Sequence, residues 1–159
     1  MNFLVTGGAG FIGYHLCERL LRDGQAVWAF DDLDNFYDPK IKEANLRDLQ
    51  SLAKPFTFVH GDLTDRAGLD QLLSSVKFDQ IIHLAARAGV RPSLLEPSLY
   101  QRVNVEGTVN LLEAARLNGV NLDRWGGYRH HDRRLAFEPL RSERDALGMV
   151  ARGGRHHAT

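Results

Sequence analysis

Apolar and polar residues follow a regular order along the first 120 residues. Four short apolar runs, rich in β-branched and aromatic side chains, have the pattern of buried parallel strands. Each run is followed by a longer segment whose apolar residues recur at helical spacing. The predicted strands lie at residues 3–6, 26–30, 56–60 and 78–84, and the predicted helices at 11–22, 40–52, 65–76 and 98–117.

This alternation predicts the fold class α/β, a Rossmann-type doubly wound parallel sheet with right-handed crossovers and strand order 3-2-1-4. A fifth strand should follow Val120, but no further apolar run is present there. We therefore expect an incomplete sheet of four strands, with a truncated Rossmann domain at 1–120 and an irregular Arg/His-rich tail at 121–159. The outer side of the fourth strand would then be exposed, which predicts a marginal, aggregation-prone domain.

The first predicted strand runs directly into a glycine-rich turn, and the first helix begins there. Gly7 allows the tight turn, Gly10 lets a diphosphate approach the backbone, and Gly13 lets the helix pack closely on the strand. The N–H groups that begin the helix would then face the phosphates. The alternative is a glycine-rich turn that binds no ligand.

Two acidic residues, Asp31 and Asp32, end the second predicted strand. They lie about 20 residues beyond the glycine turn, where a dinucleotide-binding fold holds the adenosine ribose hydroxyls. A carboxylate there also repels the 2′-phosphate of NADP, so the pattern predicts NAD. Solvated loop aspartates are the alternative.

Small residues follow the fourth predicted strand and leave room for a flat ring. Asn104 falls within a predicted buried helix, where its amide needs a partner. His60 and His83 lack metal-ligand spacing, so we expect packing or hydrogen-bonding roles for them. Cys17 has the helical position of a packed core thiol and not of a nucleophile.

Composition agrees with a globular protein: 43% of the residues are hydrophobic and 25% are charged. There is no apolar run long enough for a membrane span and no basic segment typical of a signal peptide. A single cysteine fits a reducing compartment, so we expect a cytoplasmic protein. Charge is unevenly divided, because residues 1–120 carry a net −3 and residues 121–159 a net +3.

With these features in order, the chain to about residue 120 resembles the NAD-dependent epimerase/dehydratase family, the extended short-chain dehydrogenases/reductases. The motifs of its nucleotide-sugar members match Thr-Gly-Gly-Ala-Gly-Phe-Ile-Gly at 6–13, Asp-Asp at 31–32, Tyr-Asp-Pro at 37–39, Gly-Asp-Leu at 61–63, His-Leu-Ala-Ala at 83–86 and Asn-x-x-Gly-Thr-x-Asn-Leu-Leu-Glu at 104–113. The segment Ala-Gly-Val-Arg-x-Ser at 88–93 looks most like UDP-glucuronate 4-epimerases.

The resemblance implies a role for each matching residue. It implies that the pyrophosphate of NAD is held by Gly7, Gly10, Phe11, Ile12 and Gly13, the adenosine ribose by Asp31, Asp32 and Asn35, and the adenine by Asp62 and Leu63. It implies that the path to the nicotinamide is lined by Leu84, Ala85, Ala86 and Ala88, that the adjoining loop is fixed by Asn104, and that the substrate side includes Arg91 and Ser93.

The chemistry implied by the resemblance is hydride transfer from C4 of a nucleotide sugar to NAD through a 4-keto intermediate, with the tyrosine of a Tyr-x-x-x-Lys pair as base. The tyrosines here are Tyr14, Tyr37, Tyr100 and Tyr128, and none is followed four residues later by lysine. We therefore expect the NAD-binding N-terminal portion of a UDP-glucuronate or UDP-glucose 4-epimerase-like isomerase, without catalytic residues of its own. The alternatives are a dTDP-glucose 4,6-dehydratase-like fragment and a non-catalytic NAD-binding module.

Partner expectations follow from the same resemblance. Intact family members bind UDP-sugars and form homodimers, but without a substrate domain we expect poor UDP-sugar binding. The tail is either a basic segment that binds an anion, nucleic acid or metal, or an out-of-frame translation of a G+C-rich gene. The abrupt break after Val120 favours the second, so we expect no nucleic-acid or membrane partner.

Overall fold

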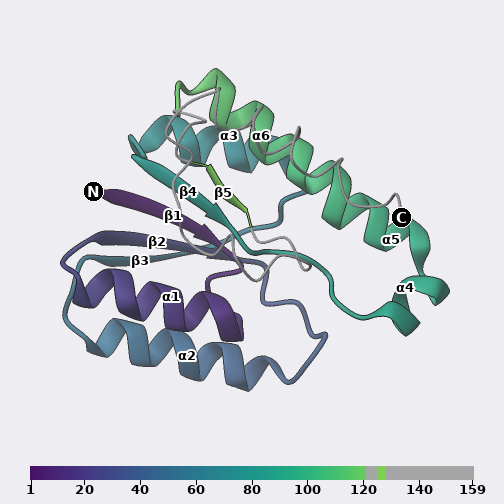
Figure 1. Cartoon of the computed structure of the whole chain (residues 1–159), viewed down its shortest axis with the longest axis horizontal. Coiled ribbons are helices and arrows are strands. Elements are labelled where there is room, and N and C mark those ends of the chain that lie inside the picture. The colour runs from purple at the N-terminus through teal and green to yellow at the C-terminus, as the bar shows by residue number, and fades with distance from the viewer. Residues whose placement is uncertain (121–124, 128–159) are drawn as a thin grey trace, which may run out of the picture.

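The fold is built on a parallel sheet. The computed structural model describes residues 1–120 and 125–127. The strands are β1 (Asn2–Thr6), β2 (Ala26–Asp31), β3 (Phe56–His60), β4 (Gln80–His83) and β5 (Trp125–Gly127). They are arranged in the order β3-β2-β1-β4-β5, and each neighbouring pair is parallel (Figure 1).

The order 3-2-1-4 predicted for the first four strands is confirmed. The expectation that no fifth strand follows Val120 is wrong, because residues 125–127 pair with β4, with Ile81 opposite Trp125 and His83 opposite Gly127. A strand of three residues, two of them glycine, has no apolar run by which it could be recognised in the sequence. The outer side of β4 therefore has a neighbour, although a marginal stability remains a prediction. The rest of the predicted tail lies outside the described residues.

Helices cover both faces of the sheet (Figure 1). On one face lie α1 (Phe11–Arg22) and α2 (Pro39–Ser51), and on the other lie α3 (Arg66–Ser75) and α6 (Gly107–Leu117). The predicted helix at 98–117 is present as α5 (Pro97–Gln101), a π-helical turn η1 (Arg102–Glu106) and α6. The short α4 (Val90–Leu95) has too few residues to show a helical period in the sequence.

Each face of the sheet has its own hydrophobic core, as expected for a doubly wound sheet. The core beneath α3 and α6 includes Leu4, Leu69, Leu73, Ile81 and Leu111. The core beneath α1 and α2 includes Val5, Cys17, Leu21, Val27 and Leu49. Cys17 is fully buried, and burial raises the pKa of its thiol to about 12, so the predicted packing role is confirmed.

Helix α2 does not bury the side that its apolar spacing favours. Ile41, Ala44, Leu49 and Leu52 fall on one side of the helix, with Leu46 at the edge of that stripe, yet Ile41 and Ala44 are exposed. The buried residues of α2 are Lys42, Leu46 and Leu49. Lysine can occupy the inner face of α2 because its charge pairs with Asp31. The sequence of the helix does not reveal this partner.

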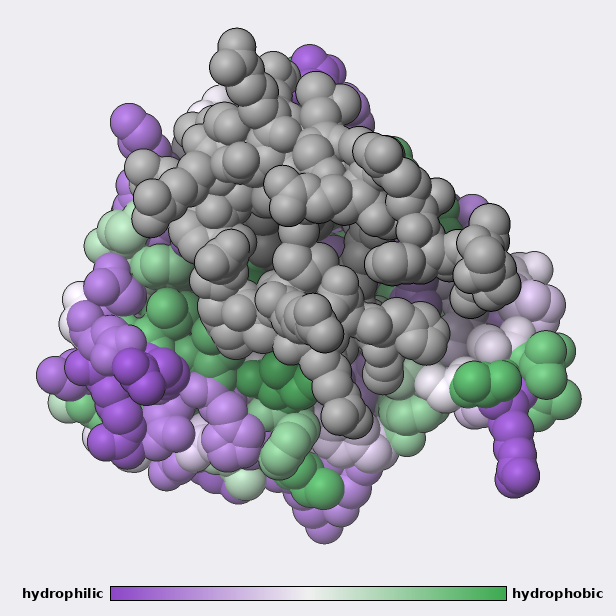
Figure 2. Space-filling view, viewed as in Figure 1, coloured by the Kyte–Doolittle hydropathy of each residue, from purple (hydrophilic) through white to green (hydrophobic). Residues whose placement is uncertain are grey.

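Part of the surface is apolar. Figure 2 shows hydrophobic residues at the outer end of the molecule where α4 lies, and Val90, Leu94 and Leu95 are the exposed apolar residues of that helix. Within residues 1–120 and 125–127, no helix combines the length and apolarity that a bilayer crossing requires.

Candidate functional site

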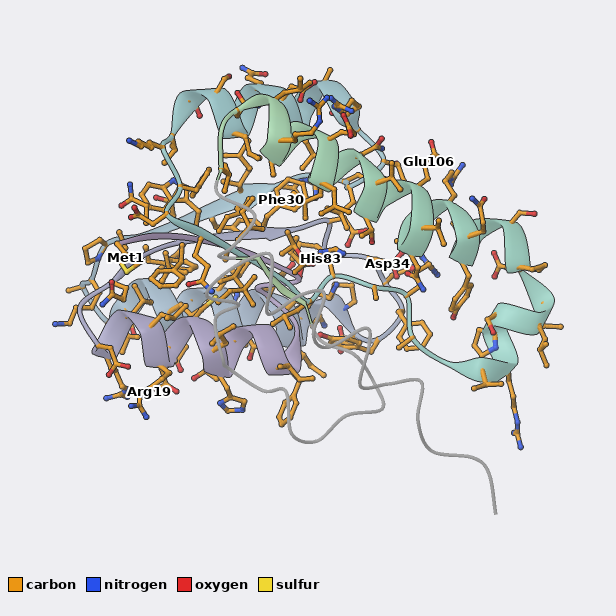
Figure 3. All side chains as sticks on the ribbon, turned by 45° about the horizontal axis from the view of Figure 1, so that its top comes forward. Met1, Arg19, Phe30, Asp34, His83 and Glu106 are labelled. Atoms are coloured by element: carbon orange, nitrogen blue, oxygen red, sulfur yellow. The ribbon has the colours of Figure 1, made fainter. Side chains whose placement is uncertain are left out.

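A cleft of about 240 Å³ lies at the carboxyl edge of the sheet. Its walls come from the loops that follow β1, β2, β3 and β4, from the end of β2, and from Lys42 of α2 and Val103 of η1. Figure 3 shows Met1 toward one end of the sheet and His83 and Asp34 toward the other, where the strands end. β2 and β3 lie on one side of β1, and β4 lies on the other. The strand order therefore reverses here, and doubly wound sheets bind ligands at such a point.

The glycine turn after β1 forms one wall of the cleft. Gly7 has φ +69°, and a Cβ there would lie 2.8 Å from the amide nitrogen of Ala85. A Cβ on Gly13 would lie 2.0 Å from the carbonyl oxygen of Gly7, so α1 passes too close for any side chain. Gly10 is the N-cap residue of α1 and supplies no side-chain cap, which leaves the first N–H groups of the helix available to a ligand.

The other residues predicted for the pyrophosphate lie outside the cleft lining. Phe11 is 75% exposed and Ile12 is 52% exposed, because both stand on the outer side of the first turn of α1. Their side chains therefore face solvent, and only their main-chain N–H groups belong to the helix start. Gly7 and Gly10 line the cleft directly.

Asp31 is the most enclosed acidic residue of the cleft. Its Oδ2 accepts a hydrogen bond from Ala9 N at 3.1 Å, and its Oδ1 accepts from Lys42 Nζ at 3.0 Å. Both side chains of this ion pair are less than one-tenth exposed. Lys42 Nζ also lies 3.9 Å from Asp32 and 5.5 Å from the centre of the Tyr37 ring.

Lys42 was missed in the sequence because lysine on a helix is ordinarily solvated. The available signal was its spacing, since Lys42, Leu46 and Leu49 recur on one helix face directly after an aspartate-rich loop. The positive charge compensates Asp31 and keeps this carboxylate in place next to the glycine turn.

The loop between β2 and α2 is folded by its own aspartates. Each carboxylate accepts a hydrogen bond from the amide two residues ahead, in a series of Asx turns. The bonds are Leu33 N to Asp31, Asp34 N to Asp32 and Phe36 N to Asp34, each at 2.9 Å. Asp34 thereby lines the cleft, whereas the predicted Asn35 is exposed and lies outside the lining.

Arg87 links this loop to the loop after β4, and sequence reasoning missed it. Its Nη1 lies 2.7 Å from Asp34 Oδ2. The predicted need of Asn104 for a partner is met here, because its Oδ1 accepts from Arg87 N at 2.7 Å and its Nδ2 donates to Arg87 O at 3.0 Å. Asn104 thus holds the main chain of the loop after β4 without lining the cleft itself.

The loops after β3 and β4 contribute further lining residues. Leu63 is buried, and Gly107 approaches it so closely that a Cβ there would lie 2.8 Å from the Leu63 Cβ. Asp62 turns the chain by accepting from Thr64 N at 2.8 Å. The lining also includes the predicted Leu84, Ala85, Ala86 and Ala88.

The two residues predicted for the substrate side lie on α4, outside the cleft lining. Arg91 is exposed. The Ser93 hydroxyl donates to Val90 O at 2.7 Å within its own helix. The described residues therefore do not bring this pair together with the cleft.

His83 is hydrogen-bonded through both ring nitrogens, as predicted. Its Nδ1 lies 2.6 Å from Thr6 Oγ1 and its Nε2 lies 3.0 Å from Thr108 Oγ1. The Thr108 hydroxyl donates to Asn104 O, so its oxygen accepts from Nε2–H, and Thr6 then donates to Nδ1. Burial lowers the pKa of His83 to about 4, which keeps the ring neutral.

His60 has a simpler environment, because its Nε2 lies 3.1 Å from Asp32 O. Hydrogen bonding was also its predicted role. In the part of the chain that the structure describes, no three His, Cys, Asp or Glu side chains are grouped as metal ligands.

The sequence profile of the family described as GDP-mannose 4,6 dehydratase matches residues 4–125. The chain belongs to this family. The UDP-glucuronate 4-epimerase of Thermodesulfobacterium geofontis is 42% identical over 118 residues, which cover 74% of this chain and 36% of that protein. The resemblance to nucleotide-sugar epimerases and dehydratases predicted from the motifs is thereby confirmed. The chain spans about a third of the length of such relatives.

Solved structures agree with this assignment. The UDP-glucose 4-epimerase of Thermus thermophilus, crystallised with NAD, matches with a TM-score of 0.63 and 36% identity, covering 76% of this chain and 35% of that one. DesIV, the dTDP-glucose 4,6-dehydratase of Streptomyces venezuelae with NAD and TYD bound, matches with a TM-score of 0.66 and 36% identity, covering 76% and 37%.

Proposed function

We propose that residues 1–120 are the NAD-binding portion of a nucleotide-sugar 4-epimerase of the UDP-glucuronate or UDP-glucose type. The observation that carries this proposal is the juxtaposition of the uncapped glycine turn and the buried Asp31 carboxylate, 3.1 Å from Ala9 N, in one cleft. A helix start that lacks its own cap attracts a diphosphate, and a fixed carboxylate beside it binds ribose hydroxyls.

The cleft residues fit the parts of a dinucleotide. In this proposal the turn from Gly7 to Gly13 holds the diphosphate through main-chain N–H groups, and Asp31 Oδ2 accepts from an adenosine ribose hydroxyl. Asp62 and Leu63 adjoin the adenine, and residues 84–88 adjoin the nicotinamide. Asp31 and Asp32 together disfavour the additional phosphate of NADP, although Lys42 weakens that repulsion.

When bound, NAD accepts hydride from C4 of the sugar. The base that this reaction requires is absent from the sequence, because Glu18, Ile41, Asn104 and Asp132 stand four residues after the four tyrosines. We therefore propose that the 159-residue chain binds NAD without epimerising a sugar by itself. Arg91 and Ser93, on α4, remain candidates for contact with a UDP-sugar that this chain binds weakly.

A 4,6-dehydratase-type parent is the second candidate, which the similarity to DesIV supports. A non-catalytic NAD-binding module is the third reading, and the absent Tyr-x-x-x-Lys favours it. The single buried cysteine supports a cytoplasmic location. The exposed Val105 and Val109 support pairing of two copies along the helix that ends in α6, as the family resemblance implies.

Calorimetric titration of NAD into the whole chain tests the proposal. We expect a dissociation constant in the micromolar range, weaker binding of NADP, and a loss of about tenfold or more in Asp31→Asn, whose amide keeps the size of the side chain and loses its charge. Asp23→Asn is the matched control, because Asp23 pairs with Arg19 on the surface.

Absence of NAD binding by a folded sample would refute the proposal. So would equal weakening by Asp31→Asn and Asp23→Asn. Incubation of the chain with UDP-glucuronate and NAD tests whether it is catalytic. Formation of the 4-epimer would contradict the proposed lack of catalysis by this chain.

A further inference from the structure

One ion pair joins two loops that are far apart in the sequence. Arg87 Nη1 lies 2.7 Å from Asp34 Oδ2, although 53 residues separate the two positions along the chain. Asp34 belongs to the loop after β2, Arg87 belongs to the loop after β4, and both line the cleft. Because β1 lies between β2 and β4, the link joins the loops on either side of the glycine turn, which lines the same cleft.

Both ends of the link are held in place. The main chain of Arg87 is fixed on both sides by the amide of Asn104, and its guanidinium lies 5.8 Å from the centre of the Tyr100 ring. At the other end, Asp34 Oδ1 accepts from Phe36 N at 2.9 Å, which leaves Oδ2 directed to the arginine. The pair therefore connects two preformed loops.

The link is nevertheless easy to break. The two side chains are 20% and 27% exposed, so water reaches the pair and competes for its hydrogen bonds. In the described part of the chain, Arg87 Nε is buried without a hydrogen-bond partner. An unsatisfied buried donor costs free energy while the pair is formed, which favours opening of the pair.

We propose that the Arg87–Asp34 pair is a strap across the glycine turn that slows the exchange of a bound dinucleotide. The inference rests on the proposed function for the identity of the ligand. The strap holds the walls of the cleft together, so a dinucleotide leaves when the pair opens. Breaking the pair then speeds release more than it changes equilibrium affinity.

Two single variants remove the pair while keeping the rest of each loop. Asp34→Asn keeps an oxygen for Phe36 N, and Arg87→Gln keeps the main chain that Asn104 binds. Arg116→Gln is the matched control, because Arg116 forms an exposed pair with Glu113 outside the cleft. Stopped-flow displacement of 1,N6-etheno-NAD by excess NAD gives the release rate. We expect release about three- to fivefold faster in each variant and in the double variant, with the control unchanged.

Hydrogen exchange of the whole chain without any nucleotide tests the strap separately from the ligand. Asp34→Asn should speed exchange in residues 86–89, and Arg87→Gln should speed exchange in residues 33–36. Faster exchange in the opposite loop together with faster release supports the proposal. Unchanged exchange in the opposite loop overturns the strap, and unchanged release overturns its gating role. If the wild type binds no NAD, the proposed function and the gating role both fail, while the exchange data still decide whether the loops are coupled.

Discussion

The buried pair of Asp31 and Lys42 makes a sharp prediction about stability. The side chains are 4% and 9% exposed, so each charge depends mainly on the other for compensation, with the half-exposed Asp32 a more distant partner of Lys42 at 3.9 Å. Their surroundings differ, because Asp31 also accepts hydrogen bonds from Ala9 N and Leu33 N. Removing the aspartate leaves a buried cation and two amide groups without their acceptor, whereas removing the lysine leaves a carboxylate that keeps both amide bonds.

The expected costs follow from this asymmetry. Asp31→Ala should lower the free energy of unfolding by about 3–5 kcal/mol, the range for breaking a buried ion pair from one side. Lys42→Met should cost about 1–3 kcal/mol, because two N–H groups continue to stabilise the carboxylate. In the double variant Asp31→Ala/Lys42→Met no charge is left unpaired, so it should be more stable than Asp31→Ala alone.

Urea unfolding followed by far-ultraviolet circular dichroism measures all four proteins, and the double-mutant cycle gives the coupling between the residues. Additive single costs would show that the two charges do not stabilise each other. A Lys42→Met cost equal to that of Asp31→Ala would show that the amide bonds to Asp31 contribute nothing. Either result would refute the reasoning.

Two further predictions concern pH and packing. His83 has a pKa of about 4 in the folded chain and about 6.5 when unfolded, so between these pH values the unfolded chain binds one more proton. The free energy of unfolding should therefore fall by about 1.4 kcal/mol per pH unit as pH falls from 6.5 to 4. Urea midpoints at pH 6.5, 5.5 and 4.5 test this, and His83→Asn should flatten the dependence. Gly13→Ala should cost about 3 kcal/mol or more, because the new Cβ meets the Gly7 carbonyl oxygen at 2.0 Å. Gly24→Ala, with φ +78° and open space around it, should cost only about 1 kcal/mol, and equal costs in denaturation would contradict the packing argument.

Local sequence features predicted the parts of the fold that local physics determines. The apolar runs locate β1 to β4, because each of these strands packs apolar side chains against the cores on both faces of the sheet. The glycine turn and Asp31 were found for a related reason, since a tight turn and a carboxylate after a strand are properties of neighbouring residues.

The missed features depend on segments that meet only in the folded chain. Lys42 is buried because α2 turns it toward Asp31, and a lysine in line with Leu46 and Leu49 is expected in solvent until that acidic partner is known. Arg87 and Asp34 look like ordinary solvated charges until the sheet brings their loops together. The strand at residues 125–127 pairs with β4 in the folded chain, and its three residues are too few to show a strand pattern in the sequence.

The Asx turns between β2 and α2 have a thermodynamic consequence. Because the three carboxylates shape this loop from within, its order is established when the chain folds and does not wait for a ligand. A nucleotide that enters the cleft then buries surface without folding a segment. The heat-capacity change of nucleotide binding should therefore have the magnitude expected from the apolar surface that the nucleotide covers. It should lack the additional negative contribution that is seen when a segment folds on binding.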